Sequence, residues 1–162
     1  MSTGDVPVGK TGPIRVLVVD DHEPWRRFVT TSLQSDGNFV VLGEASDGLE
    51  AVQMVKQLQP DLVLLDIGLP RLNGIEAARQ IAQLSPQSKV LFVSENRSRD
   101  IAEAALGTRA SGYLVKSDAG SELLPALQAV LQGKRFISAS LAGQFLLAAV
   151  CTWIAMLTSG IL

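Results

Sequence analysis

The residues with the clearest chemical potential are polar side chains that directly follow apolar runs of the sequence: Asp20, Asp21, Asp66, Ser94 and Lys116. Carboxylates about 4 Å apart repel by roughly 4 kcal/mol at an effective dielectric near 20, so three of them together require a cation or a raised pKa. A site made of oxygen ligands alone suits Mg²⁺. Because the chain has one cysteine and His22 is its only histidine, the composition argues against zinc.

Lys116 and Ser94 add the two functional groups that a phosphoryl group carried by Asp66 would need. An ammonium group would offset the phosphoryl charge, and a hydroxyl group would donate a hydrogen bond to a phosphoryl oxygen. Each residue alone has an ordinary interpretation, as an exposed lysine and a turn serine. Their combination with the acidic residues favours phosphoryl chemistry.

Asp66 follows the apolar run 63–65, which is bounded by proline and glycine residues and is typical of a strand buried on both faces. Asp66 therefore lies at the carboxyl end of a strand, where the ligand sites of open α/β sheets collect. Asn73 and Gly74 are better placed than Asp66 to start the next helix. Asp66 is thus not needed as a helix cap.

The same pattern recurs along the chain. Further strands are predicted at 14–19, 39–45, 89–93 and 112–115, and helical spacing of apolar residues predicts helices over 23–33, 49–58, 75–84, 101–106 and 121–132. Five strand-helix units with short loops predict a doubly wound parallel sheet with right-handed crossovers. Such a sheet gathers the polar strand ends at one edge. In the first helix, the apolar stripe is interpreted as core packing: Trp25, Phe28, Val29 and Leu33.

These motifs resemble the receiver domain of bacterial two-component response regulators, over residue 14 to about residue 131. The Asp20-Asp21-His22 opening and the Gly-Tyr-Leu-Val-Lys segment at 112–116 are similar to the NarL/LuxR-type subgroup. The resemblance implies a flavodoxin-like (βα)5 fold with strand order 2-1-3-4-5.

The resemblance also implies a role for each site residue. Asp66 would be the phosphoacceptor, and Asp20, Asp21, Asp66 and the backbone carbonyl of Gly68 would bind Mg²⁺. Three further residues take the remaining roles: Ser94 the switch hydroxyl, Tyr113 the aromatic switch and Lys116 the characteristic lysine.

The mechanism implied is phosphoryl transfer to Asp66 from a histidine kinase, a phosphotransfer protein or a small donor such as acetyl phosphate. The acyl phosphate would draw in Ser94, Tyr113 would turn inward, and the surface of the fourth helix, fifth strand and fifth helix would change for protein partners. The chain would then be a signalling switch that catalyses only its own transfer and hydrolysis, and not an enzyme.

Two alternatives stay open. One is a degenerate receiver that acts as a binding or dimerisation module without phosphorylation. The other is an aspartate-nucleophile phosphatase of the haloacid dehalogenase type, which is disfavoured because Asp20-Asp21-His22 replaces the Asp-x-Asp of that family. The sequence departs from the receiver pattern in three places: Glu95 stands where a small residue is usual, Ser117 follows Lys116 where proline is common, and the chain ends in an apolar tail. Glu95 and the tail favour the degenerate receiver, whereas the presence of all the acceptor residues argues against it.

The composition limits the compartment and the partners. A net charge of -2 without a basic stripe argues against non-specific binding to nucleic acid. The single cysteine, Cys151, excludes an intramolecular disulfide, suits a reducing compartment and is interpreted as a small buried side chain. The sequence start lacks an apolar signal segment. We therefore expect a cytoplasmic protein with a flexible leader over residues 1–13 and a receiver domain over residues 14–133.

The remaining segment, residues 134–162, is predicted to be an apolar helical tail. After Arg135 it carries no charged side chain. Because a LuxR-type DNA-binding domain needs more chain and basic residues, we expect no direct DNA binding. A helix over residues 141–162 would measure about 33 Å, which would suit an anchor in the inner membrane. We favour pairing with a second copy, to give a homodimer, or packing on the domain over anchoring, and a gene remnant is a third interpretation.

Overall fold

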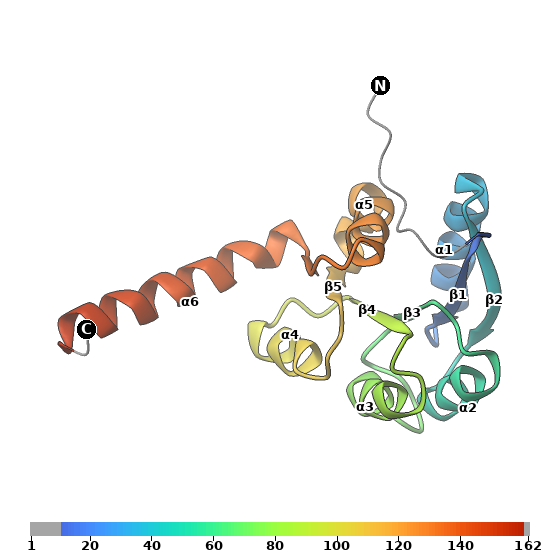
Figure 1. The fold of residues 1–162 in the computed structure, drawn as a ribbon, viewed down its shortest axis with the longest axis horizontal. Helices are drawn as coiled ribbons and strands as arrows, with labels where there is room; N and C mark the ends of the chain where they lie inside the picture. Colours follow the sequence, from blue (N-terminus) through green and yellow to red (C-terminus); the bar gives the residue numbers. More distant parts are fainter. Residues whose placement is uncertain (1–10, 161–162) are drawn as a thin grey trace.

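The computed structural model describes residues 11–160, and of residues 146–152 it describes the backbone alone. Its elements follow one another in alternation (Figure 1): β1 Ile14–Val19, α1 Glu23–Asp36, β2 Phe39–Ala45, α2 Gly48–Leu58, β3 Leu62–Leu65, α3 Gly74–Leu84, β4 Lys89–Ser94, α4 Arg99–Leu106, β5 Gly112–Val115, the 3-10 turn η1 Lys116–Asp118, α5 Ala119–Leu131, β6 Phe136–Ile137 and α6 Ala139–Thr158. The predicted strands and helices are confirmed to within about three residues at most of their ends.

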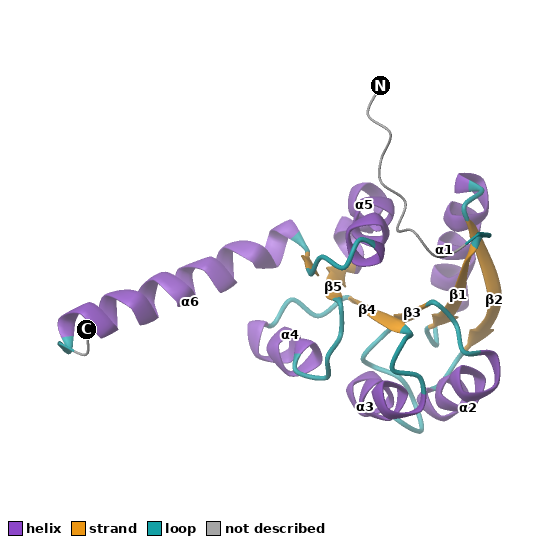
Figure 2. Ribbon diagram, viewed as in Figure 1, coloured by secondary structure: helices purple, strands orange, loops and turns teal. Residues whose placement is uncertain are grey.

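The strands form one parallel sheet in the order β2-β1-β3-β4-β5-β6. Helices α1 and α5 cover one face, and α2, α3 and α4 cover the other (Figures 1 and 2). β3 lies between β1 and β4, and its side chains are at most 2% exposed. The doubly wound fold with strand order 2-1-3-4-5 is confirmed, and β6 extends it by one short strand.

Side-chain caps start the helices that follow the site loops. The carboxylate of Asp47 accepts a hydrogen bond from the Glu50 amide at the start of α2, and Asn73 accepts one from the Glu76 amide at the start of α3. These caps satisfy backbone amides that have no partner within the helix. As predicted, Asn73 and not Asp66 caps α3.

The apolar stripe of α1 packs into the core over only part of its length. Val29 and Leu33 are fully buried, whereas Trp25 is half-buried and Phe28 is 42% exposed. The prediction of core packing is therefore wrong for Phe28. A loop of three residues separates β1 from α1, so the first turn of α1 lies at the carboxyl edge of the sheet, where Trp25 meets Lys116.

The predicted tail contributes to the domain before it leaves it. β6 pairs with β5, matching Gly112 with Phe136 and Tyr113 with Ile137. The first turns of α6 then bury Leu141 in the same core cluster as Tyr113. Beyond this base, which we define as residues 138–145, α6 extends away from the sheet (Figure 1). The sequence pattern favours pairing or packing over anchoring for this segment, and its base packs on the domain.

The predictions for the leader, for Cys151 and for the end of the tail fall partly or wholly outside the described residues. Residues 1–10 of the predicted leader, the side chain of Cys151 and the end of the predicted tail at 161–162 lie outside the described residues. Within the part of the chain that is described, no helix combines the length and the apolar character that crossing a membrane requires.

Candidate functional site

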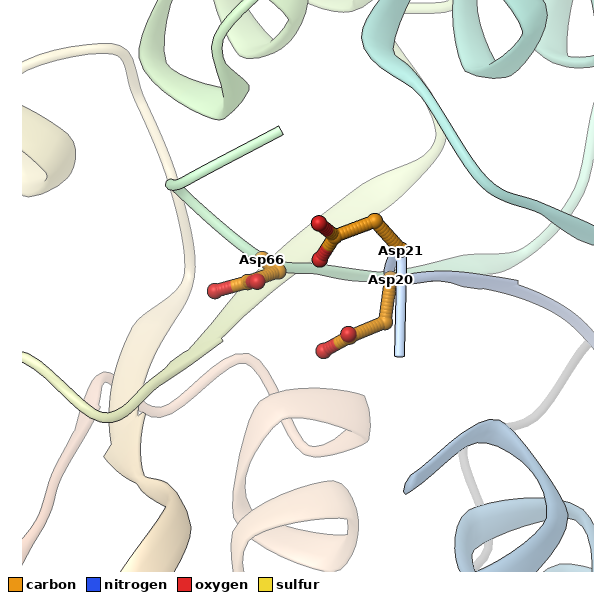
Figure 3. Close-up of side chains that lie close together, drawn as sticks. All are labelled: Asp20, Asp21 and Asp66. Atoms are coloured by element: carbon orange, nitrogen blue, oxygen red, sulfur yellow. The ribbon is translucent and has the colours of Figure 1, made fainter. Parts of the chain in front are cut away.

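Three carboxylates lie together at the carboxyl edge of the sheet. Asp20 and Asp21 follow β1, Asp66 follows the adjacent strand β3, and one carboxylate oxygen from each lies within 4.8 Å of the others (Figure 3). Asp20 and Asp66 are buried, and Asp21 is exposed. The parallel pairing of β1 with β3 thus brings together residues that are 45 positions or more apart in the chain, as the sequence predicts.

Backbone amides fix the two buried carboxylates. The amide of His22 donates to Asp20 Oδ1 at 2.8 Å, and the amide of Ile67 donates to Asp66 Oδ1 at 2.8 Å. Each carboxylate therefore has its Oδ1 atom engaged, and Oδ2 of both lies on the side of Lys116. The Lys116 Nζ atom lies 2.5 Å from Asp20 Oδ2 and 3.6 Å from Asp66 Oδ2.

The electrostatics of the site leave it short of positive charge. Burial raises the pKa of Asp66 above its ordinary value of 3.8, the nearby Lys116 ammonium opposes this rise, and the charges of Asp20 and Asp21 add to it. With all three carboxylates ionised, the cluster would carry three negative charges against the single positive charge of Lys116, an excess of two. A bound divalent cation would balance that excess.

The donor set fits Mg²⁺ in its chemistry. The cluster offers carboxylate oxygens and contains neither histidine nor cysteine, which matches the preference of a hard divalent cation. Gly68 lies two residues after Asp66 in an exposed loop, and its carbonyl stays a predicted fourth ligand. The residues present therefore fit the metal that the sequence predicts.

Ser94 and Tyr113 meet beside this cluster through Asn96. The Ser94 hydroxyl at the end of β4 accepts a hydrogen bond from the Asn96 amide at 3.1 Å, and the Tyr113 hydroxyl donates to the Asn96 carbonyl at 2.7 Å. Tyr113 is fully buried, and burial raises the pKa of its phenol above 10.0 while its hydrogen bond to Ser94 opposes the rise. The aromatic switch predicted from the sequence is thus inward in this structure.

Sequence reasoning missed two residues that shape the site. The Trp25 ring lies with its centroid 5.2 Å from Lys116 Nζ, and a Cβ atom added to Gly74 would lie 1.9 Å from the Asp66 carbonyl oxygen. The spacing of Trp25 indicated only a core stripe. The position of Gly74 after Asn73 indicated only a helix start, although a glycine beside a site residue is also a signal of close backbone approach.

Two of the departures from the receiver pattern, Glu95 and Ser117, also lie near the site. Glu95 is exposed and lines a pocket of about 490 Å³ together with Trp25 and Lys116. The hydroxyl of Ser117 accepts a hydrogen bond from Arg97 at 2.6 Å, and no described peptide bond is cis.

Comparison with known protein families matches residues 16–128 to the response regulator receiver domain. The chain belongs to this family. Its receiver domain is 36% identical over 124 residues to the transcriptional regulatory protein DegU of Brevibacillus brevis, a match that covers 76% of this chain and 52% of DegU. The chain spans between about half and two thirds of the length of the curated relatives it matches.

Solved receiver structures share the fold. A LuxR-family two-component response regulator from Aurantimonas sp. SI85-9A1 is similar with a TM-score of 0.81 and 32% identity, covering 86% of this chain and 99% of that one. The CheX–CheY complex with BeF3- and Mg²⁺ from Borrelia burgdorferi is similar with a TM-score of 0.70 and 27% identity, covering 74% of this chain and 90% of the matched chain. The family and the flavodoxin-like fold expected from the sequence are confirmed.

Proposed function

We propose that this receiver domain accepts a phosphoryl group on Asp66 in a Mg²⁺-dependent reaction and signals through changes in protein contacts. The observation that carries the proposal is the arrangement of three carboxylates within 4.8 Å of one another, with the Lys116 ammonium 3.6 Å from Asp66 Oδ2. The similarity to a CheX–CheY complex that contains Mg²⁺ and BeF3- supports it.

The transfer step uses Asp66 as the nucleophile. A carboxylate oxygen of Asp66 attacks the phosphorus atom of the donor, an O–P bond forms, and the N–P bond of a phosphohistidine or the O–P bond of acetyl phosphate breaks. The leaving group departs with the electron pair of that bond. The donor is accordingly a histidine kinase, a phosphotransfer protein or a small acyl phosphate.

The residues around Asp66 provide charge and position. Asp20, Asp21, Asp66 and the Gly68 carbonyl would hold Mg²⁺, which supplies positive charge to phosphoryl oxygens when it is bound. Lys116, already beside Asp66 Oδ2, offsets the charge of the acyl phosphate.

The same site is connected to the surface that would signal its state. In the proposed switch the Ser94 hydroxyl donates to a phosphoryl oxygen, and its link through Asn96 to Tyr113 joins the end of β4 to β5. A change at Ser94 therefore shifts the population of the α4, β5 and α5 surface, and protein partners that prefer one arrangement read it. We propose a cytoplasmic protein in a phosphorelay.

A degenerate receiver without phosphorylation is the second candidate. The observation that favours it is the carboxylate of Glu95, which adjoins Ser94 and lines the pocket beside Lys116. A negative charge at the entrance would repel an anionic phosphodonor. The protein would then act through binding or dimerisation alone.

One assay separates these candidates. Purified protein is incubated with acetyl phosphate and either Mg²⁺ or EDTA, and its intact mass is recorded for wild type, Asp66→Asn and the exposed control Asp100→Asn. The phosphoacceptor function predicts a gain of one phosphoryl group in wild type and in the control, only with Mg²⁺, and none in Asp66→Asn. Absence of a gain in wild type, with acetyl phosphate and with a panel of histidine kinases, would favour the binding module.

A further inference from the structure

Lys116 has two kinds of partner. The carboxylates of Asp20 and Asp66 form ion pairs with it, and the centroid of the Trp25 ring lies 5.2 Å from the same ammonium nitrogen. A cation within about 6 Å of an indole centroid is attracted by the ring quadrupole. The side chain of Lys116 is only 11% exposed, so this attraction acts in a partly desolvated setting.

Trp25 is itself held in place. Its ring lies 5.2 Å from the Phe28 ring at an interplanar angle of 42°, and its side chain packs against the core cluster that contains Val29 and Leu33. Trp25 also belongs to the first turn of α1, which a loop of three residues joins to β1. The indole is therefore a fixed wall attached to the strand that carries the acidic pair.

The indole also borders a pocket that Lys116 itself lines. Trp25 and Lys116 both line the pocket of about 490 Å³ that Glu95 borders. Lysine has a long flexible stem with several rotamers, and without a wall on this side its ammonium could turn toward the pocket and the Glu95 carboxylate. Trp25 makes the orientation toward Asp66 the favoured one.

The contact gains importance when Asp20 has another partner. The closest partner of Lys116 in the structure is Asp20, which is also a proposed metal ligand. A cation bound to Asp20 would weaken the pair between Asp20 and Lys116. The Trp25 indole and the Asp66 carboxylate would then be the contacts that keep Lys116 at the site.

We propose that Trp25 is a positioning residue that holds the Lys116 ammonium beside Asp66 through a cation–π contact. The proposal rests on the phosphoacceptor function proposed above. It assigns to Trp25 a role in the reaction that its place in the α1 stripe does not indicate.

The first test is a substitution series that weakens and then removes the aromatic ring. Trp25→Leu keeps an apolar side chain without a ring, and Trp25→Phe keeps a weaker ring. The rate constant for phosphoryl incorporation from acetyl phosphate with Mg²⁺ should fall about fivefold to thirtyfold in Trp25→Leu and by an intermediate factor in Trp25→Phe. Thermal unfolding of each variant reports whether a loss of fold contributes.

A double-substitution cycle separates positioning from structure. In the Lys116→Met background the ammonium is absent, so Trp25→Leu should change the residual rate by less than about twofold. A purely structural role of Trp25 would lower the rate by the same factor in both backgrounds. Equal factors would therefore overturn the proposal.

The contact has a readout that needs no phosphodonor. The chain has two tryptophans, and Trp153 lies in the exposed part of α6, so Trp153→Phe leaves Trp25 as the single fluorophore and should keep the wild-type rate. In this background Lys116→Met should change the wavelength or yield of Trp25 emission, and an unchanged spectrum would contradict the contact.

The two proposals can fail separately. If the wild-type protein takes up no phosphoryl group, the proposed function is refuted, and with it the role of Trp25. Phosphorylated wild type with an equally fast Trp25→Leu variant refutes the role of Trp25 alone.

Discussion

Strand β3 and the outer part of α6 are both apolar, but only β3 is buried. The side chains of β3 are at most 2% exposed, because β1 and β4 flank the strand and helices cover both faces of the sheet. In α6, Trp153 is 63% exposed and Leu157 is 48% exposed, and the helix extends away from the sheet. Burial in this chain therefore follows from the neighbours of a segment and not from its hydrophobicity alone.

The base of α6 shows the same rule within one helix. Leu141 is fully buried beside the core cluster of Tyr113, and Ser138 accepts a hydrogen bond from the Val115 amide and donates one to Glu122. These contacts bind the base to β5 and α5, two of the elements that form the proposed switching surface. The change from buried to exposed side chains thus occurs inside α6.

The largest contrast is expected between two leucines of α6. Leu141→Ala should lower the free energy of unfolding by about 2–5 kcal/mol, because it removes a fully buried side chain and leaves a cavity. Leu157→Ala, in the exposed part, should change it by about 0.5 kcal/mol or less. Urea unfolding of both variants measures the difference. Equal losses would mean that the outer part of α6 is also buried in solution.

Substitution of two glycines compares backbone packing beside Asp66, which follows β3, with backbone packing in α6. Gly74→Ala should destabilise the domain by about 1–3 kcal/mol or more, since the new Cβ atom would lie 1.9 Å from the Asp66 carbonyl oxygen and the loop would have to shift. Gly143→Ala meets no atom within 4 Å and should be neutral or raise stability by up to about 1 kcal/mol. Thermal and urea unfolding report both, and a harmless Gly74→Ala would contradict the close approach at the site.

A pair of serines tests how the base of α6 is attached. Ser138→Ala should cost about 1–3 kcal/mol, because the buried Val115 amide would lose its acceptor. Ser140 is exposed and its hydroxyl donates to Asp118, so Ser140→Ala should lower the free energy of unfolding by about 0.5 kcal/mol or less. Hydrogen exchange of the Val115 amide, followed by NMR, should accelerate in Ser138→Ala alone.

The smallest expected effect concerns the pH dependence of stability. Because burial raises the pKa of Asp66 in the folded protein above 3.8, the folded state binds this proton more tightly than the unfolded chain. The resulting stability is fully present below pH 3.8 and is lost as the pH rises through the folded pKa. In EDTA at pH 7, Asp66→Asn should therefore be more stable than wild type, with a gap that closes toward pH 3.8.

The exposed carboxylate of Asp100 provides the control for this measurement. Asp100→Asn should give no comparable gain, because Asp100 does not lie in the buried acidic cluster. Stability curves of the three proteins between pH 3 and pH 8 make the comparison. A wild type that is more stable than Asp66→Asn at pH 7 in EDTA would contradict the raised pKa.

The sheet and the site residues were predictable because short-range signals specify them. Apolar runs bounded by turn residues marked β1 to β5, and the residue after each run then had to lie at one edge of a parallel sheet. This reasoning placed Asp20, Asp21, Asp66 and Lys116 together, and the structure confirms their proximity.

The missed features depend on contacts that no local pattern encodes. β6 has two residues, too few for a periodic signal, and forms because Phe136 and Ile137 lie beside β5. The helical spacing of Trp25 and Phe28 predicted that both lie on the same face of α1. It could not predict which turns of α1 lie over the sheet and which lie at its carboxyl edge. The contact of Trp25 with Lys116 depends on the position of the first turn of α1 at this edge.

The phosphoacceptor role of Asp66 is tested most directly by chemical trapping of the modified residue. Protein treated with acetyl phosphate and Mg²⁺ is reduced with sodium borohydride, which converts an aspartyl phosphate to homoserine, and the position of the homoserine is mapped by peptide mass spectrometry. We predict homoserine at position 66, dependent on Mg²⁺ and absent in Asp66→Asn. Homoserine at another aspartate, or a phosphoryl group that resists reduction, would contradict the assignment.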